Sequence, residues 1–264
     1  MSTTSRPTVL VLSGHDPSGG AGLQADIETL ASQQCHAASI ITALTEQDTH
    51  NVKTLLPQSP EAFLCQAKTL LADVAVSAVK IGLIGSPDLV LAIAEILALL
   101  PKQAVVLDPV LAAGGGASLA GKGLIDNLKH VLLPKTTVLT PNSQEARKLS
   151  GVDDLTASGL ALLDSGCEYV LITGSHEHTK DVCNLLFHDG RLLETYTWPR
   201  LPYSYHGSGC TLASAVAAAL AQGKPVETAI RHAQDFTWHS LKTAFRISGG
   251  QAIPNRFFEL IPCR

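Results

Sequence analysis

Charge is scarce in this chain, since 16% of its 264 residues are Asp, Glu, Lys or Arg and the net charge is -4. No polybasic stretch is present that could grip a nucleic-acid backbone or an anionic bilayer, so both are excluded as partners. A continuous run of about 18 apolar residues, which a membrane span requires, is also missing. The first seven residues are polar and lack the apolar core of a signal peptide, so we expect them to be flexible and the protein to be cytoplasmic.

Paired cysteines are missing as well. The six cysteines are scattered, and no C-x-x-C pair occurs among them. Neither a zinc site nor a disulfide framework is therefore indicated, and a reducing cytosol is the simplest compartment. The chain also lacks linkers, internal repeats and low-complexity blocks, while 45% of its residues are hydrophobic. We expect one compact α/β domain over residues 1–264.

What the chain does have is a regular alternation of short apolar runs and longer helical patterns. The predicted buried strands are Thr8–Leu12, Ala38–Leu44, Ala78–Ile81, Ala104–Leu107, Thr137–Leu139 and Tyr169–Ile172. The predicted helices are Gly22–Gln33, Pro60–Leu71, Pro87–Leu99, Gly121–Leu132, Ser143–Ser150, Thr156–Gly166 and a final one over Val226–Phe245. Such alternation predicts right-handed βαβ units and a mostly parallel sheet covered on both faces.

A late pair of strands departs from this rhythm. The segments Val182–Phe187 and Leu192–Thr197 are joined by His-Asp-Gly-Arg, and an Asp-Gly turn is typical of an antiparallel hairpin. We therefore predict an antiparallel hairpin added to the parallel sheet. In sheets of this kind ligands bind at the carboxyl ends of the strands.

The most informative stretch is His-Gly-Ser-Gly-Cys-Thr at residues 206–211, followed by a run of small residues that favours a helix. A loop that opens a helix presents unpaired N–H groups and a favourable dipole to an anion such as a phosphate. Cys210 lies in that field, which predicts a thiol pKa lowered toward neutrality. The structural alternative is a turn with Ser208 as the helix cap and Cys210 as an apolar filler.

Two further positions offer polar groups to a flat, aminated ring. Asp26 lies on the first turns of the helix that follows a loop with four glycines, and Gln47 lies just past the second predicted strand. A carboxylate accepts a hydrogen bond from an exocyclic amine, and an amide donates one to a ring nitrogen. Alternatively, Asp26 is a surface charge that complements the helix dipole, and Gln47 is an ordinary loop residue.

Polar side chains also follow later strands. Asp108 ends the fourth predicted strand, and Asn142 and Glu145 follow the fifth. Asn142 and Glu145 are well placed to cap the next helix. Separate acids at strand ends also suit Mg²⁺, which prefers carboxylates and waters shared with phosphate oxygens.

Three of these stretches carry a family resemblance. Gly-Ser-Gly-Cys-Thr preceded by His206 resembles the anion-hole loop of the hydroxymethylpyrimidine/phosphomethylpyrimidine kinases, the thiamin-pathway branch of the ribokinase superfamily. In most of that superfamily an aspartate stands at the position of Cys210, so the cysteine indicates the pyrimidine-kinase branch. The segments Asp16–Asp26 and Ile41–Gln47 resemble the same family almost residue for residue. The resemblance covers nearly the whole chain.

The resemblance implies a ribokinase-like three-layer α/β/α sandwich, a homodimer, and ATP with Mg²⁺ as cofactors. It implies that Cys210 is the base, with the backbone N–H groups of the loop steadying the transferred phosphoryl group. The implied anion loop is Gly207, Ser208 and Gly209; the implied aminopyrimidine contacts are Gly14, Asp26 and Gln47; the implied phosphate and hydrated-metal residues are Asp108, Asn142, Glu145 and Thr173, the last as a weak phosphate contact.

The chain departs from the family at two lysines. Thr-Gly-Ser-His at 173–176 stands where the family has Lys-Gly-Gly-His, and the loop Ala112–Gly116 holds no lysine. Because phosphoryl transfer depends on charges that neutralise the phosphates, either the metal and the loop amides suffice, or His176, His178 or Lys180 substitutes, or activity is reduced.

The function expected from the resemblance is ATP-dependent phosphorylation of 4-amino-5-hydroxymethyl-2-methylpyrimidine and then of its monophosphate. Two alternatives stay open. The first is a pyridoxal kinase of the same superfamily, which acts on a similar ring. The second is a protein that binds a pyrimidine or pyridoxal phosphate without transferring phosphate, and the missing lysines favour it.

Overall fold

A computed structural model of the protein describes residues 6–112 and 121–260. Its strands form one nine-stranded sheet in the order β3-β2-β1-β4-β5-β6-β7-β8-β9. The strands are β1 (Thr8–His15), β2 (His36–Gln47), β3 (Val52–Pro57), β4 (Ala78–Ile81), β5 (Ala104–Leu107), β6 (Val138–Leu139), β7 (Tyr169–Ile172), β8 (Asp181–His188) and β9 (Arg191–Pro199). The pairs from β2 through β1, β4, β5 and β6 to β7 are parallel, and β3, β8 and β9 join by antiparallel pairing.

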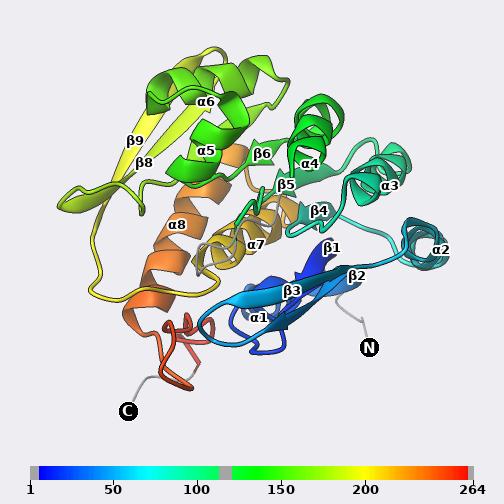
Figure 1. Ribbon diagram of the computed structural model, residues 1–264, viewed down its shortest axis with the longest axis horizontal. Helices are drawn as coiled ribbons and strands as arrows, with labels where there is room; N and C mark the ends of the chain where they lie inside the picture. Colours follow the sequence, from blue (N-terminus) through cyan, green and yellow to red (C-terminus); the bar gives the residue numbers. More distant parts are fainter. Residues whose placement is uncertain (1–5, 113–120, 261–264) are drawn as a thin grey trace.

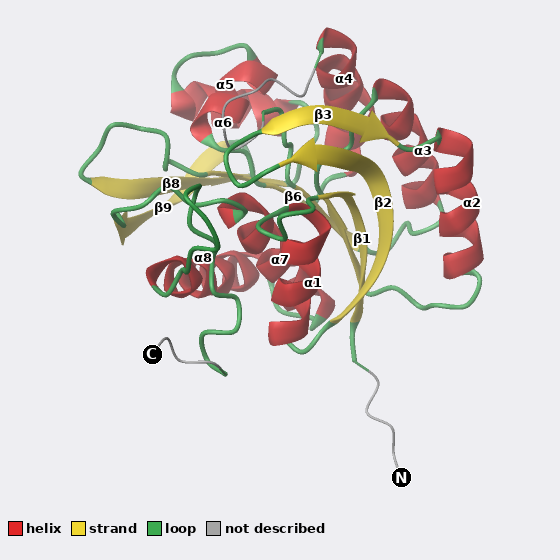
Figure 2. Cartoon of the chain, turned by 60° about the horizontal axis from the view of Figure 1, so that its bottom comes forward, coloured by secondary structure: helices red, strands yellow, loops and turns green. Residues whose placement is uncertain are grey.

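Helices cover both faces of this sheet (Figure 1, Figure 2). The helices are α1 (Gly22–Ser32), α2 (Pro60–Leu71), α3 (Pro87–Ala98), α4 (Lys122–Asn127), α5 (Ser143–Ser150), α6 (Leu155–Asp164), α7 (Ser208–Ala221) and α8 (Val226–Lys242). Helices α2 to α6 lie on one face, and α1, α7 and α8 lie on the other. The three-layer α/β/α architecture is thereby confirmed.

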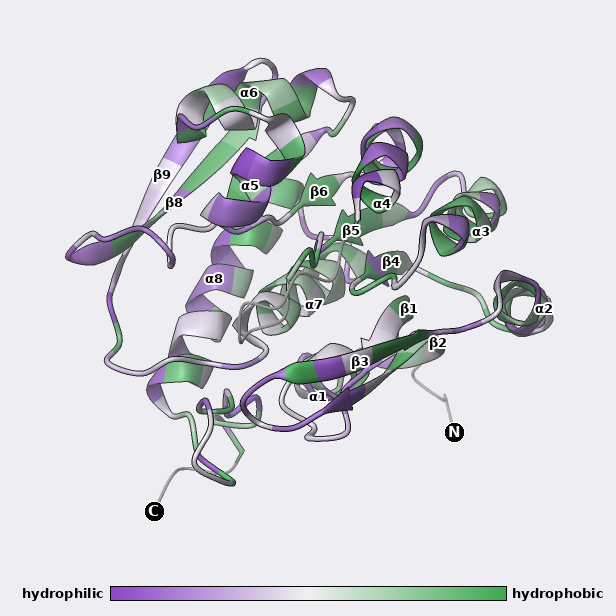
Figure 3. Ribbon diagram, viewed as in Figure 1, coloured by the Kyte–Doolittle hydropathy of each residue, from purple (hydrophilic) through white to green (hydrophobic). Residues whose placement is uncertain are grey.

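Each face of the sheet has its own apolar core because side chains alternate along a strand. In β1, Leu10 and Leu12 pack with the α2–α6 layer, whereas Val9 and Val11 pack with α1, α7 and α8. Figure 3 shows the central strands and most of α7 in hydrophobic colours, and hydrophilic residues along α8. Helix α7 is thus the buried helix of its layer, which fixes its first turn relative to the sheet.

The sequence-based elements agree with the structure in the centre of the fold. The predicted bounds of α2, α5, β4, β5 and β7 are those observed. The late hairpin is confirmed too, and both residues of its turn, Asp189 and Gly190, have positive φ values of 52° and 67°.

Two predictions at the periphery were incomplete or wrong. Strand β3 was not predicted; it pairs antiparallel with β2 at the sheet edge, where most of its residues are exposed. The last helix ends at Lys242 and not at Phe245, because Phe245 instead bridges antiparallel to Ile253 in the carboxyl-terminal segment. Within the described ranges, no helix is long and apolar enough to cross a membrane.

Candidate active site

The loop at residues 206–211 opens α7 as predicted. Gly207 is the residue before the helix, its φ is +81°, and no side chain caps the helix start. A Cβ atom at Gly207 would lie 2.1 Å from the carbonyl oxygen of Gly20, so only glycine fits there. The alternative in which Ser208 caps the helix is wrong, since Ser208 is its first residue. The uncapped first turn leaves N–H groups available to an anion.

Cys210 is the third residue of α7, and its sulfur lies between two loops. The backbone of Gly22 and the carboxylate of Asp108 lie close enough to this thiol to influence its pKa or to be influenced by it. Burial raises the pKa of Cys210 to about 12, although Lys80 acts in the opposite direction. The predicted lowering of this pKa is therefore wrong, because desolvation by the surrounding protein atoms outweighs the helix terminus even though Cys210 is only partly buried.

A buried lysine below Cys210 was missed by the sequence analysis. Lys80 in β4 is fully buried, and its Nζ lies 2.7 Å from Oδ1 of Asp26. Burial alone would lower the pKa of Lys80, but attraction to Asp26, Cys210 and Asp108 raises it, so the ammonium stays charged. A Cβ at Gly82 would lie 2.6 Å from this Nζ, so a glycine makes room for it. The available signal was a charged residue inside an otherwise apolar strand.

Asp26, the predicted amine acceptor, is also fully buried. Its Oδ1 is occupied by Lys80 and by the hydroxyl of Ser214, which donates at 2.7 Å. Its Oδ2 has no hydrogen-bond partner within the described residues. A buried carboxylate oxygen without a partner is costly, so a ligand N–H or a water at this atom is favourable. The alternative in which Asp26 is a surface charge is wrong.

Gln47 is the last residue of β2 and belongs to a second polar group. Its Nε2 lies 3.3 Å from Nε2 of His206, which lies 2.8 Å from Oδ2 of Asp16. Burial opposes ionisation of Asp16, but hydrogen bonds from His206 and Ser18 hold its pKa well below the usual range. Asp16 and His206 were recognised only as parts of motifs, because their contact spans 190 residues of sequence.

The first glycine-rich loop joins the anion loop through backbone atoms. Gly14 is buried. A Cβ atom built on Gly22 would lie 2.4 Å from the carbonyl oxygen of Gly14, so the two backbone segments are in close contact. Because Gly22 and Asp26 both influence the pKa of Cys210, the structure brings Gly14, Asp26 and Cys210 into one region at the first turn of α7.

The residues predicted to hold phosphates and metal lie at the ends of β5, β6 and β7. Asn142 caps α5 and Glu145 completes the capping box, since Glu145 Oε2 accepts the Asn142 N–H at 2.9 Å. The second oxygen of Glu145 accepts the N–H of Leu111 at 3.3 Å. Thr173 lies beside Asn142 in a parallel bridge. The capping alternative is thus confirmed, and these residues also share one edge of the sheet.

Two buried acids in this group repel each other. Burial raises the pKa of Glu145 to about 8, and the neighbouring Asp108 adds to the shift. Burial also raises the pKa of Asp108 to about 6, although Lys80 opposes the shift. Among the described residues no cluster of three or more His, Cys, Asp or Glu could ligate a metal directly. A hydrated divalent cation fits this pair, because it would neutralise their charge through water.

Two arginines from other segments, Arg147 and Arg200, contact the loop after β7, where the family lysine is missing. Arg200 donates to the carbonyl oxygens of Ser175 and Glu177 at 2.8 and 2.7 Å. Arg147 makes a two-pronged ion pair with Glu177, at 2.7 and 3.0 Å. None of these contacts assigns a substitute for the lysine, and burial lowers the pKa of His176. Of the loop Ala112–Gly116, residues 113–116 lie outside the described residues.

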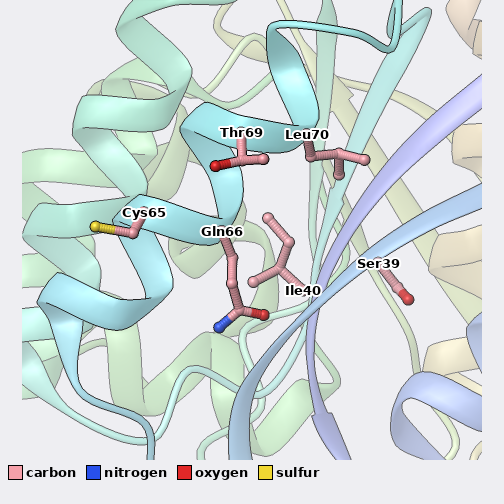
Figure 4. Close-up of a pocket in the computed structure, with 6 residues that line it drawn as sticks. All are labelled: Ser39, Ile40, Cys65, Gln66, Thr69 and Leu70. Carbon is pink, nitrogen blue, oxygen red and sulfur yellow. The ribbon is translucent and has the colours of Figure 1, made fainter.

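A hollow elsewhere on the surface contains none of the predicted site residues. It lies between β2 and α2 and is lined by Ser39, Ile40, Cys65, Gln66, Thr69 and Leu70 (Figure 4). No charged side chain is among them.

The family model described as phosphomethylpyrimidine kinase matches residues 16–255. The hydroxymethylpyrimidine/phosphomethylpyrimidine kinase of Streptomyces coelicolor is 38% identical over 250 residues, which are 92% of each chain. This chain belongs to the phosphomethylpyrimidine kinase family. Membership makes it a phosphotransferase with ATP as a substrate.

Solved structures of the phosphomethylpyrimidine kinase type and of pyridoxal kinases share the fold. The ADP complex of Bacillus subtilis pyridoxal kinase has a TM-score of 0.87 and 28% identity, over 96% of this chain and 98% of that one. Phosphomethylpyrimidine kinase from Clostridium difficile has a TM-score of 0.77 and 29% identity, over 90% of this chain and 100% of that one. The ribokinase-like architecture is therefore confirmed.

Proposed function

We propose that this protein transfers the γ-phosphoryl group of ATP to 4-amino-5-hydroxymethyl-2-methylpyrimidine, and then to its monophosphate, in thiamin biosynthesis. Residues 1–264 act as one kinase domain, and the enzyme works as a homodimer. The observation that carries the proposal is the position of Cys210 in the uncapped first turn of α7, in the neighbourhood of Gly22 and Asp108.

Cys210 is the general base in this mechanism. The hydroxymethyl oxygen attacks the γ-phosphorus of ATP while its proton moves to Sγ. Since the raised pKa of Cys210 favours the protonated thiol, its S–H bond must break as the alcohol proton arrives, and the neighbouring carboxylate of Asp108 is the acceptor for that proton. General-base assistance of this kind contributes about 10²–10⁴-fold.

The backbone N–H groups of Gly207, Ser208 and Gly209 hold the transferred group. They belong to the uncapped start of α7, where the helix dipole also favours negative charge. Because this turn is fixed by the packing of α7 against the sheet, the donors are in place before the substrates bind.

The ring is recognised by Gly14, Asp26 and Gln47. The free oxygen of Asp26 suits the exocyclic amine, and the amide of Gln47, held beside His206, suits a ring nitrogen. Asp108, Asn142 and Glu145 hold hydrated Mg²⁺, and Thr173 contacts phosphate. Mg²⁺, when bound, screens the negative charge of the phosphates.

A second candidate substrate is pyridoxal. The observation in its favour is that pyridoxal kinases superpose with a TM-score of 0.87, against 0.77 for the phosphomethylpyrimidine kinase structure. The buried Asp26 favours the aminated pyrimidine, because a carboxylate oxygen accepts from an N–H group.

A coupled assay of ATP consumption tests the proposal on the pyrimidine alcohol, its monophosphate and pyridoxal. We expect turnover with the first two, and a higher kcat/KM for the alcohol than for pyridoxal. Cys210→Ala should lower kcat by about 10²–10⁴-fold and leave pyrimidine affinity within about threefold. Cys65→Ala, at an exposed position on α2, is the matched control and should leave turnover unchanged. If no ATP is consumed with any of the three substrates, the protein binds its ligand without transferring phosphate.

A further inference from the structure

The carboxyl-terminal segment returns to the core after α8. Ala252 pairs with Tyr205, and Ile253 pairs with Phe245. The N–H of Asn255 then donates to the carbonyl oxygen of Ser240 in α8 at 2.9 Å. Figure 1 shows this segment in red beside the end of α8. Its path brings the next residue, Arg256, to the two glycine-rich loops.

Arg256 is fully buried and makes one contact with each of three elements. Its Nη2 donates to the carbonyl oxygen of Gly20 at 2.6 Å, in the first glycine-rich loop. Its Nε donates to the hydroxyl of Thr211 at 3.0 Å, in the first turn of α7. Its Nη1 pairs with Glu28 of α1 at 2.9 Å. Because the guanidinium group is planar and rigid, these three contacts fix the relative positions of the first glycine-rich loop, α7 and α1.

The two loops that Arg256 joins are already in close contact. A Cβ atom at Gly207 would lie 2.1 Å from the Gly20 carbonyl oxygen and 2.8 Å from Nη2 of Arg256. The hydroxyl of Thr211 donates to the carbonyl oxygen of Gly207 at 2.8 Å and accepts from Arg256. A displacement of Arg256 would thus release both loops, because Gly20 and Thr211 share it as a donor.

The contacts of Arg256 also place a permanent cation behind the anion loop. Glu28 is its acidic partner and is 29% exposed, whereas the Arg256 side chain is fully buried. The positive charge is therefore least screened on the side of Gly20 and Gly207.

We propose that Arg256 is a positioning residue that holds the first glycine-rich loop (residues 14–22) and the anion loop (residues 206–211) in a fixed relative position. This relative position is called the loop register, or the register, below. The inference rests on the proposed kinase function for its effect on turnover, but the register itself is a property of the free protein. As a positioning residue, Arg256 acts through its contacts with Gly20, Thr211 and Gly207.

Hydrogen–deuterium exchange on the full-length protein without ligands tests the register directly. Arg256→Met should increase amide exchange in peptides covering residues 14–22 and 205–212, and leave the β7–β9 region unchanged. Arg231→Met is the matched control, since Arg231 is an exposed arginine paired with Glu194. Arg256→Lys keeps the charge without the fork and should resemble Arg256→Met. Unchanged exchange in both loops, or a lysine variant identical to the wild type, would overturn the proposal.

Kinetics then test the consequence for turnover. For folded Arg256→Met we expect kcat to fall about 100-fold, because a misplaced loop loses the geometry of transfer. Pyrimidine affinity, measured by calorimetry without ATP, should fall by a smaller factor than kcat, because Asp26 and Gln47 lie outside the two released loops. If exchange increases but kcat is unchanged, the positioning role is refuted. A wild-type protein without turnover would instead refute the kinase function, and the exchange data would still decide the register.

Discussion

At the scale of single residues, the Lys80–Asp26 pair sets the electrostatics below the anion loop. Both side chains are fully buried, and the ion pair is 2.7 Å long. Removal of one partner from a buried pair leaves an uncompensated charge, which costs about 3–5 kcal/mol. Lys80→Met should therefore lower the free energy of unfolding by about that amount, as measured by urea denaturation.

The double variant Lys80→Met with Asp26→Asn is the control for this prediction. It removes both charges, so it should be more stable than Lys80→Met alone. If the free energy of unfolding of Lys80→Met lies within about 1 kcal/mol of that of the wild type, the Lys80–Asp26 ion pair does not contribute the predicted stabilisation.

Residue-scale predictions from sequence succeeded where a motif is local. Ser208 and Cys210 lie in the first turn of α7 and Gly207 directly precedes it, as the loop-to-helix motif predicts. Lys80 and Arg256 were missed because their partners are distant in sequence: Asp26 lies 54 residues from Lys80, and Gly20 lies 236 residues from Arg256. The pKa of Cys210 was predicted in the wrong direction because its burial depends on packing, which local sequence does not contain.

At the scale of elements, the two ends of α7 offer a matched comparison. Gly207 before the helix and Gly223 after it have φ values of +81° and +79°. A Cβ at Gly207 would collide with the Gly20 backbone, whereas nothing lies within 4 Å of one at Gly223. Gly223→Ala should cost only the strain of a positive φ, about 1 kcal/mol.

Gly207→Ala carries the same strain and the collision as well. We expect it to lower the free energy of unfolding by at least about 2 kcal/mol and to abolish most turnover, since the first turn of α7 must shift. Thermal unfolding and kcat, measured for both variants, check the prediction. Equal effects of the two substitutions would show that the contact between Gly20 and Gly207 is unimportant.

The same packing logic explains which elements sequence could predict. Buried strands such as β4 and β7 are continuous apolar runs or nearly so, and their bounds were predicted as observed. Strand β3 has no buried residue and a mixed pattern, because it pairs only with β2 at the edge of the sheet. Such a strand is defined by its hydrogen bonds to a neighbour, which apolar periodicity does not report.

At the scale of the whole molecule, the parallel sheet gathers loops from distant parts of the chain. Asp16 follows β1 and His206 precedes α7, yet the two meet at 2.8 Å. Hydrogen bonds from His206 and Ser18 outweigh burial and hold the pKa of Asp16 below its usual range. The pKa of an Asp side chain in an unfolded chain is about 3.9. The stabilisation by the Asp16 carboxylate is therefore complete above that pH and is lost as the pH falls through the folded-state pKa.

Asp16→Asn should therefore be less stable than the wild type at about pH 6, by about 1–3 kcal/mol, because charge-assisted hydrogen bonds are lost. The gap should narrow as the pH falls below about 4, where the wild-type carboxylate begins to lose the same advantage. Urea denaturation between about pH 6 and pH 3 measures it, with Asp73→Asn at an exposed position as the control. A gap that stays constant over this range would show that the Asp16 charge does not stabilise the contact between the two loops.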